Sequence, residues 1–134
     1  MYGTSKYELI QLIKQLKQGD DAAKLDCISF FCDESKGMWH NRARARIARN
    51  LKNDMLTSSE KTRIVAVILR RFVDGNFFEQ FSDQLDLALK LNPDLTLEAA
   101  RKGLTSTKAF IRRKSVWLLL RQERIEKSKT ERNE

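Results

Sequence analysis

The sequence has little of what sheets, metal sites and membrane spans require. One proline and five glycines leave few positions for the tight turns that join strands. No run approaches the roughly 18 apolar residues of a membrane-spanning helix. The first residues, MYGTSKYELIQ, lack the basic start and apolar stretch of a signal peptide. A single histidine and two cysteines argue against a zinc site. We therefore predict an all-α protein with no membrane segment and no bound metal.

Catalytic motifs are also missing. The chain has no glycine-rich phosphate loop, no G-x-S-x-G motif and no carboxylate pair beside an evident apolar cleft. His40 follows Trp39 on an apolar face, where a packed and hydrogen-bonded histidine is the usual case. Cys27 and Cys32 lie five residues apart in one helical pattern and face different sides, which is typical of a reduced, cytoplasmic protein. We expect neither enzymatic activity nor a cofactor.

Charge is abundant but unevenly distributed. Charged residues make up 33% of the 134 positions, and the formal net charge is +8. Residues 1–34 carry a net charge of −2, residues 35–73 carry +8, residues 74–100 carry −5 and residues 101–134 carry +7. The sign of the net charge changes about once per structural unit, which indicates a repeat rather than a uniformly basic surface.

Helical spacing of the apolar residues and capping signals predict seven helices. Ser5 with Glu8 and Thr57 with Glu60 have the spacing of capping boxes, and Pro93 predicts a break. The expected helices cover residues 6–18, 21–35, 38–52, 59–73, 77–91, 95–103 and 105–122. We expect residues 1–121 to form one domain. The polar segment 122–134 has one apolar residue in its last twelve positions, ERIEKSKTERNE, and we expect it to be frayed or disordered.

A shift of 34 residues superimposes the expected core positions. Ala43 then coincides with Phe77 and Ile111, and Leu51 coincides with Leu85 and Leu119. This register describes one leading helix followed by three helix pairs at 24–52, 58–91 and 95–121. Because each pair is too small to bury its own apolar face, it must stack on the next pair. The predicted fold is a short right-handed α-solenoid.

The pairs resemble HEAT-type repeats. LEAARKGLTSTKAFIRRKSVWLL is similar to such a repeat, with the apolar–arginine pair Ile111–Arg112 opening its second helix. Ala43–Arg44 stands in the equivalent place in KLDCISFFCDESKGMWHNRARARIARNL. The middle unit departs from the pattern, since Phe78 replaces the arginine. The resemblance implies that Arg44 and Arg112 are structural, with packed stems and guanidinium groups bonded to nearby carbonyls or an acid.

The tetratricopeptide repeat is the second choice of family. It also has 34 residues, and LALKLNPD resembles the end of one, with Ala88 and Pro93 at suitable spacing. That register puts the bulky Phe81 where a small residue is required, so the HEAT-like reading is preferred. Arg70 and Arg71 come at the end of an expected helix, where cations favour the helix dipole.

Three arginines of the segment 39–51 are expected to face solvent. Arg42, Arg46 and Arg49 lie opposite its apolar side on a helical wheel. The 34-residue register places them in columns that run across the second helices. These columns are Arg46, Gln80 and Lys114; Arg42, Asn76 and Phe110; and Arg49, Asp83 and Trp117.

Such a face suits a nucleic acid. Arginine forks bind phosphate through two hydrogen bonds, and Trp117 has the flat ring on which an unpaired base stacks. We therefore predict a non-catalytic module that binds DNA or RNA. The residues expected to contact it are Arg42, Arg46, Arg49, Gln80, Arg113, Lys114 and Trp117.

Two alternatives remain open. The ion pairs Arg49–Asp83 and Glu79–Arg113 are able to form a solvated ladder that only holds successive units in register. The chain is also a candidate protein-interaction adaptor that docks a helix or an acidic segment. Its leading helix carries more apolar residues than one side needs, so the adaptor alternative includes a homodimer through that helix.

Overall fold

The computed structural model describes residues 5–78 and 80–133. Within these ranges the chain folds into seven α-helices and no strand, which confirms the predicted class and number of helices. The helices are α1 (Lys6–Lys17), α2 (Asp21–Cys32), α3 (His40–Leu51), α4 (Ser58–Asp74), α5 (Phe81–Leu91), α6 (Pro93–Gly103) and α7 (Ala109–Asn133).

Local signals determine where the central helices begin and end. Thr57 and Glu60 form the predicted capping box of α4, with the Thr57 hydroxyl accepting from the Glu60 amide and the Glu60 carboxylate accepting from the Thr57 amide. Gly75 ends α4 at φ 75°, a left-handed conformation that glycine adopts without strain. Asn92 caps α6, and Pro93 occupies the first turn, where its missing N–H has no cost.

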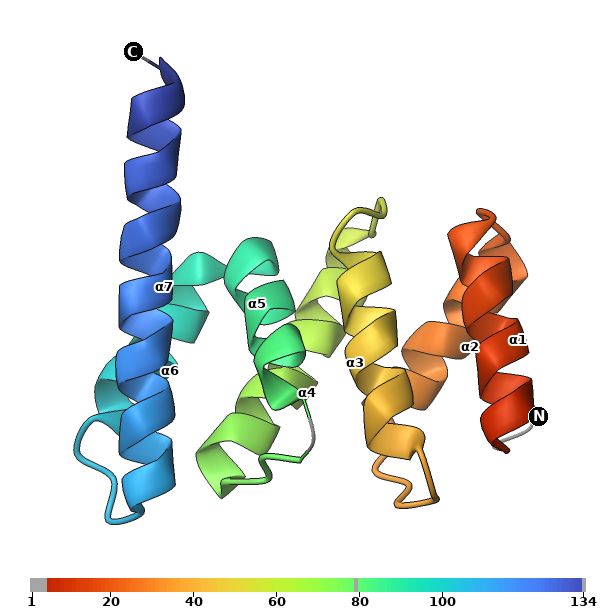
Figure 1. The fold of residues 1–134 in the computed structure, drawn as a ribbon, viewed down its shortest axis with the longest axis horizontal. Coiled ribbons are helices and arrows are strands. Elements are labelled where there is room, and N and C mark those ends of the chain that lie inside the picture. Colours follow the sequence, from red (N-terminus) through yellow and green to blue (C-terminus); the bar gives the residue numbers. More distant parts are fainter. Residues whose placement is uncertain (1–4, 79, 134) are drawn as a thin grey trace.

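The helices form two rows (Figure 1). The helices α1, α3, α5 and α7 follow one another along the front of the view, and α2, α4 and α6 lie behind them. Within the front row α3 packs against both α1 and α5, and within the back row α4 packs against both α2 and α6. The first helix, α1, and the last, α7, lie at opposite ends of the front row. The largest fully buried side chains include Phe30 and Phe31 of α2 and Leu85 of α5.

The helix α5 begins later than predicted. It starts at Phe81 rather than residue 77, and Gln80 before it adopts a left-handed conformation with φ 59°. The ring of Phe77 stacks between Phe72, at 5.6 Å, and Phe81, at 5.1 Å, so aromatic packing holds the segment after Gly75 outside the helix. The middle positions of two predicted columns, Asn76 and Gln80, are therefore not on α5.

The C-terminal segment differs from the expectation of a frayed tail. The helix α7 continues to Asn133 and projects well beyond its neighbours (Figure 1). Its last turns contain no glycine or proline and are rich in Glu, Lys and Arg, which favour helix strongly. The Gln122 amide also donates to the Glu126 carboxylate four residues later, at 3.0 Å.

The apolar face of α1 is used inside the fold. Leu9, Leu12, Ile13 and Leu16 are buried, and α1 packs against α2 and α3. Tyr7 is the exposed large apolar residue of this helix, at 72%. Little of the surface that suggested a dimer through the leading helix is therefore open. None of the helices in the described ranges combines the length and apolar character needed to cross a membrane.

Candidate functional site

The segment that follows α2 is held by a buried arginine. Arg44 is 3% exposed, and its Nη2 donates to the carbonyls of Asp33, at 2.6 Å, and Ser35, at 2.7 Å. Its guanidinium carbon lies 5.1 Å from the centre of the Phe30 ring. These are the contacts with neighbouring carbonyls that the HEAT-like resemblance implied for Arg44. The side chain is enclosed by the fold and does not reach the exposed face of α3.

Arg71 is the second arginine with a buried guanidinium among the described residues, and its burial was not predicted from the sequence. It is 4% exposed, and its Nη2 donates to the carbonyls of Phe31, at 2.6 Å, and Asp33, at 3.1 Å. Its Nε donates to the Glu34 carboxylate at 3.1 Å, and its Nη1 donates to Gln84 at 3.0 Å. Burial lowers the pKa of Arg71, and the neighbouring Glu34 acts in the opposite direction.

The sequence contained a signal for Arg71. Its position follows Ile64 and Ile68 by seven and three residues, which places it on the buried face of α4. The interpretation as a dipole-favoured cation considered only its place near the helix end. Arg112, which was expected to resemble Arg44, is instead exposed and donates to the Ser106 carbonyl at 2.7 Å.

His40 is packed and hydrogen-bonded, as expected. It is 4% exposed, and its Nδ1 accepts from the Gly37 amide at 3.0 Å and lies 2.9 Å from the Ser35 hydroxyl. The ring meets Phe30 edge to face, with centroids 5.1 Å apart. A Cβ added at Gly37 would lie 2.4 Å from this ring, so the loop requires glycine there.

The exposed face of α3 carries Arg42, Arg46 and Arg49, as the helical wheel predicted. The guanidinium carbon of Arg46 lies 5.1 Å from the centre of the Trp39 ring, and the ammonium group of Lys6 lies 5.7 Å from it. Both distances are within the range of cation–π attraction. Trp39 thus lies beside two cations, of which the predicted columns included Arg46 but not Lys6.

Polar contacts connect α5 to both of its neighbours in the front row. Arg49 pairs with Asp83 at 2.7 Å, which confirms one of the two predicted ladder pairs. Arg121 of α7 pairs with Asp86 at 3.0 Å on the other side. The second predicted pair, Glu79–Arg113, lies outside the described residues because Glu79 does. The two carboxylates of α5 are therefore compensated by cations from α3 and α7.

The α7 residues of the predicted site differ in their burial and in the contacts they make with other side chains. Lys114 lies 5.0 Å from the centre of the Trp117 ring and donates to the Ser82 hydroxyl at 3.0 Å. Burial lowers the pKa of Lys114. Trp117 is half-buried and packs against the core. Arg113 is exposed, and it forms no ion pair with any residue that the structure describes.

The residues predicted to contact nucleic acid therefore differ in their surroundings. Arg42, Arg46 and Arg113 are exposed, and of these Arg46 and Arg113 form no ion pair with a described residue. Arg49 and Lys114 bond to α5. Gln80 is exposed but lies before α5 rather than on it. The arrangement offers cations on two helices, separated by a helix whose charges are paired. Such a surface is able to bind anionic groups.

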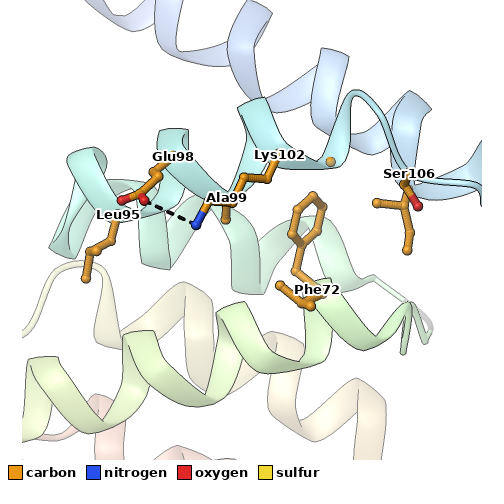
Figure 2. Close-up of a pocket in the computed structure, with 9 residues that line it drawn as sticks. Phe72, Leu95, Glu98, Ala99, Lys102 and Ser106 are labelled. Atoms are coloured by element: carbon orange, nitrogen blue, oxygen red, sulfur yellow. Dashed lines mark ion pairs between the residues drawn. The ribbon is translucent and has the colours of Figure 1, made fainter.

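A separate feature lies in the back row, between α4 and α6. A cavity of about 390 Å³ opens there, and Phe72 of α4 and Leu95 of α6 point into it (Figure 2). Lys102 and Glu98 pair across one turn of α6 at its rim, at 3.3 Å. A second cavity of about 350 Å³ adjoins it and shares Leu95. Together they form an apolar groove, which we call the α4–α6 groove.

Across residues 5–78 and 80–133 no cluster of three His, Cys, Asp or Glu side chains is placed to hold a metal ion. Burial raises the pKa of Cys27 to about 12, which keeps this thiol protonated and unreactive at neutral pH. Burial also raises the pKa of Cys32, against the opposing effect of nearby arginines.

Comparison with family models, curated proteins and solved structures gives no match to this chain. The sequence and structure establish an all-helical domain, with seven helices in the part of the chain that the structure describes.

Proposed function

We propose that the chain is a non-catalytic module that binds nucleic acid through phosphate contacts on the front row of helices. The contacts come from Arg42, Arg46 and Arg113, with Lys6 beside Trp39. The observation that supports this most is the pairing of Asp83 and Asp86 with Arg49 and Arg121. Because the carboxylates of α5 are compensated, a polyanion that crosses from α3 to α7 does not meet an unpaired acidic helix.

The same proposal includes the repeat architecture. The front and back rows are the arrangement expected of a short right-handed α-solenoid of HEAT-like pairs with α1 as the leading helix. The contacts of Arg44 with the segment between α2 and α3 further support the HEAT-like interpretation. The absence of Arg112 from the interior is a point on which the last pair differs from the first.

Fluorescence polarisation with labelled DNA and RNA, titrated over a range of salt concentrations, tests the proposal. Several phosphate contacts give a log–log salt slope of about −3 or steeper. The variant Arg46→Ala/Arg113→Ala removes two exposed cations, so we expect the slope to become shallower by about 2 and the affinity to fall for all sequences alike. Lys114 is a poorer probe because it also bonds to Ser82.

The matched control is Arg63→Ala/Arg101→Ala. It removes the same charge from exposed positions on α4 and α6 in the opposite row. We expect the salt slope of this variant to equal that of the wild type. Equal losses in the two double variants would mean that binding follows net charge alone, and the assignment to the front row would be wrong. No binding at low salt would refute the proposed function itself.

An adaptor for another protein is the second candidate function, and the α4–α6 groove favours it. Its walls are apolar, with Val73 exposed at 65% and Leu95 at 48%. Grooves of this kind accept the apolar face of an amphipathic helix. Solution mass at increasing concentration and the composition of the purified sample separate the candidates. An adaptor self-associates or retains one protein partner, whereas a nucleic-acid binder copurifies with nucleic acid.

A further inference from the structure

Trp39 has an unusual backbone conformation for a bulky residue. It stands at the N-cap of α3 with φ 71° and ψ −1°, in the left-handed region, and its side chain makes no capping hydrogen bond. Glycine, asparagine or aspartate adopts this conformation with less strain, and serine, threonine, asparagine or aspartate would cap the helix. The position therefore serves neither backbone geometry nor capping through its side chain. The property that tryptophan adds at this position is its flat aromatic surface.

The ring lies between the fold and solvent. One part packs against the core, and the residue as a whole is half-buried. Cations from two different helices approach it, with Arg46 of α3 at 5.1 Å and Lys6 of α1 at 5.7 Å from its centre. Both cations are exposed, and neither forms an ion pair with a described residue. Trp39 therefore presents a flat aromatic surface beside the positive charges of Arg46 and Lys6.

The second tryptophan has a different environment. The cation over Trp117 is Lys114, which is half-buried and bonded to Ser82 at 3.0 Å. A ligand at Trp117 would have to displace a hydrogen-bonded and partly desolvated lysine. At Trp39 the side chain of Arg46 is able to swing away from the ring toward a phosphate without breaking a hydrogen bond to a described residue.

We propose that Trp39 is a stacking platform for an unpaired nucleobase, with Arg46 and Lys6 binding the adjoining phosphates. One nucleotide carries both the π-face that stacks on indole and the negative charge that attracts the two cations. A duplex hides its base faces inside the stack and offers phosphates alone. This inference rests on the proposed function and narrows its ligand to single-stranded nucleic acid or to unpaired loops and ends.

Intrinsic tryptophan fluorescence tests the inference, because the chain has two tryptophans. In Trp117→Phe the emission comes from Trp39 alone, and in Trp39→Phe it comes from Trp117 alone. Each protein is titrated at low salt with a fluorescein-labelled ten-nucleotide single strand and with its duplex, and polarisation is recorded in parallel. We expect the single strand to quench Trp39 strongly, the duplex to quench it weakly, and Trp117 to change little with either.

Affinity provides the second readout. We expect Trp39→Leu to weaken single-strand binding about tenfold and duplex binding by less than twofold, with Trp117→Leu as the matched control. Circular dichroism verifies that each variant is folded, and the quenching of Trp39 in Trp117→Phe stands even if Trp39→Leu does not fold. A single strand that binds by polarisation but leaves Trp39 emission unchanged would overturn the inference and leave the proposed function intact. Quenching of Trp117 instead would also overturn it, and no binding of either oligonucleotide would refute both.

Discussion

The back row contains two junctions between neighbouring helices, and they are built differently. At the junction of α2 and α4, the buried Arg71 extends from α4 to the carbonyls of Phe31 and Asp33. At the junction of α4 and α6, the facing side chains include Leu95 and Ala99, and the cavity measures about 390 Å³. A buried guanidinium thus closes one junction, whereas short apolar side chains leave the other open.

The difference shows how a small helical chain adjusts the distance between similar units. A guanidinium with several carbonyl partners fixes both the separation and the register of two helices, because each bond is directional. Apolar contacts fix neither as strictly. The consequence here is that the first junction is fully used by the fold, while the second keeps apolar surface available to a ligand or partner.

The largest expected effect is at the closed junction. Arg71→Ala leaves the carbonyls of Phe31 and Asp33 and the amide oxygen of Gln84 without their donor in a buried place. We expect the free energy of unfolding to fall by about 3 kcal/mol, as measured by urea denaturation. Arg71→Met retains the apolar stem, and we expect it to lose nearly as much, because the hydrogen bonds rather than the packing are at stake.

Arg70→Ala is the control for this experiment. Arg70 is adjacent, carries the same charge and lies 3.8 Å from the same carboxylate, but its side chain is 62% exposed. We expect a change within about 0.5 kcal/mol. If Arg71→Ala also changed stability by less than 1 kcal/mol, water would be replacing the guanidinium, and the contrast between the two junctions would lose its energetic meaning.

Most of the fold could be predicted from the sequence, and the exceptions have physical reasons. Apolar spacing, the Thr57 capping box and Pro93 predicted seven helices because these are local signals. The late start of α5 depends on Phe77 stacking with rings from two helices, which is a tertiary contact. The length of α7 was missed because its polar composition indicated disorder, although its residues favour helix individually.

The site was predicted less completely than the fold. The helical wheel placed Arg46 on the exposed face of α3 and Arg44 on the buried face, because one helix determines both directions. Trp39 and Lys6 come together only when α1 packs beside α3, and no spacing in the sequence shows that. The 34-residue columns failed at Gln80 because they assumed equal helices in every unit.

An intermediate effect on stability is expected at the contact between α6 and α7. A Cβ added at Gly103 would lie 2.0 Å from the hydroxyl oxygen of Ser115, which is fully buried. Gly103→Ala should improve helix propensity by up to about 1 kcal/mol, but the clash should outweigh this gain and produce a net loss of about 1–2 kcal/mol. We expect the loss in thermal and urea denaturation alike.

Ser115→Ala tests whether the clash with the Ser115 hydroxyl causes the loss of stability in Gly103→Ala. It removes the clashing oxygen, which donates a hydrogen bond to the Ile111 carbonyl within the same helix. Gly103→Ala combined with Ser115→Ala should therefore be at least as stable as Ser115→Ala alone. A double variant that kept the full loss would show that the close approach of α6 and α7 has another origin, and the packing described for this pair would be wrong.

The smallest effect is expected at Ala99 of α6. Comparing it with the neighbouring Ala100 distinguishes a residue of the groove from a residue of the core. Ala99 lines the α4–α6 groove, whereas Ala100 is completely buried. We expect Ala99→Leu to change the free energy of unfolding by less than about 0.5 kcal/mol, because the added atoms enter open space. The same substitution at Ala100 should cost about 1–3 kcal/mol through overpacking. Equal losses at both positions in urea denaturation would mean that α4 and α6 close on each other in solution. Since leucine and alanine differ little in helix propensity, the difference between the two variants reports the space around each residue and little else.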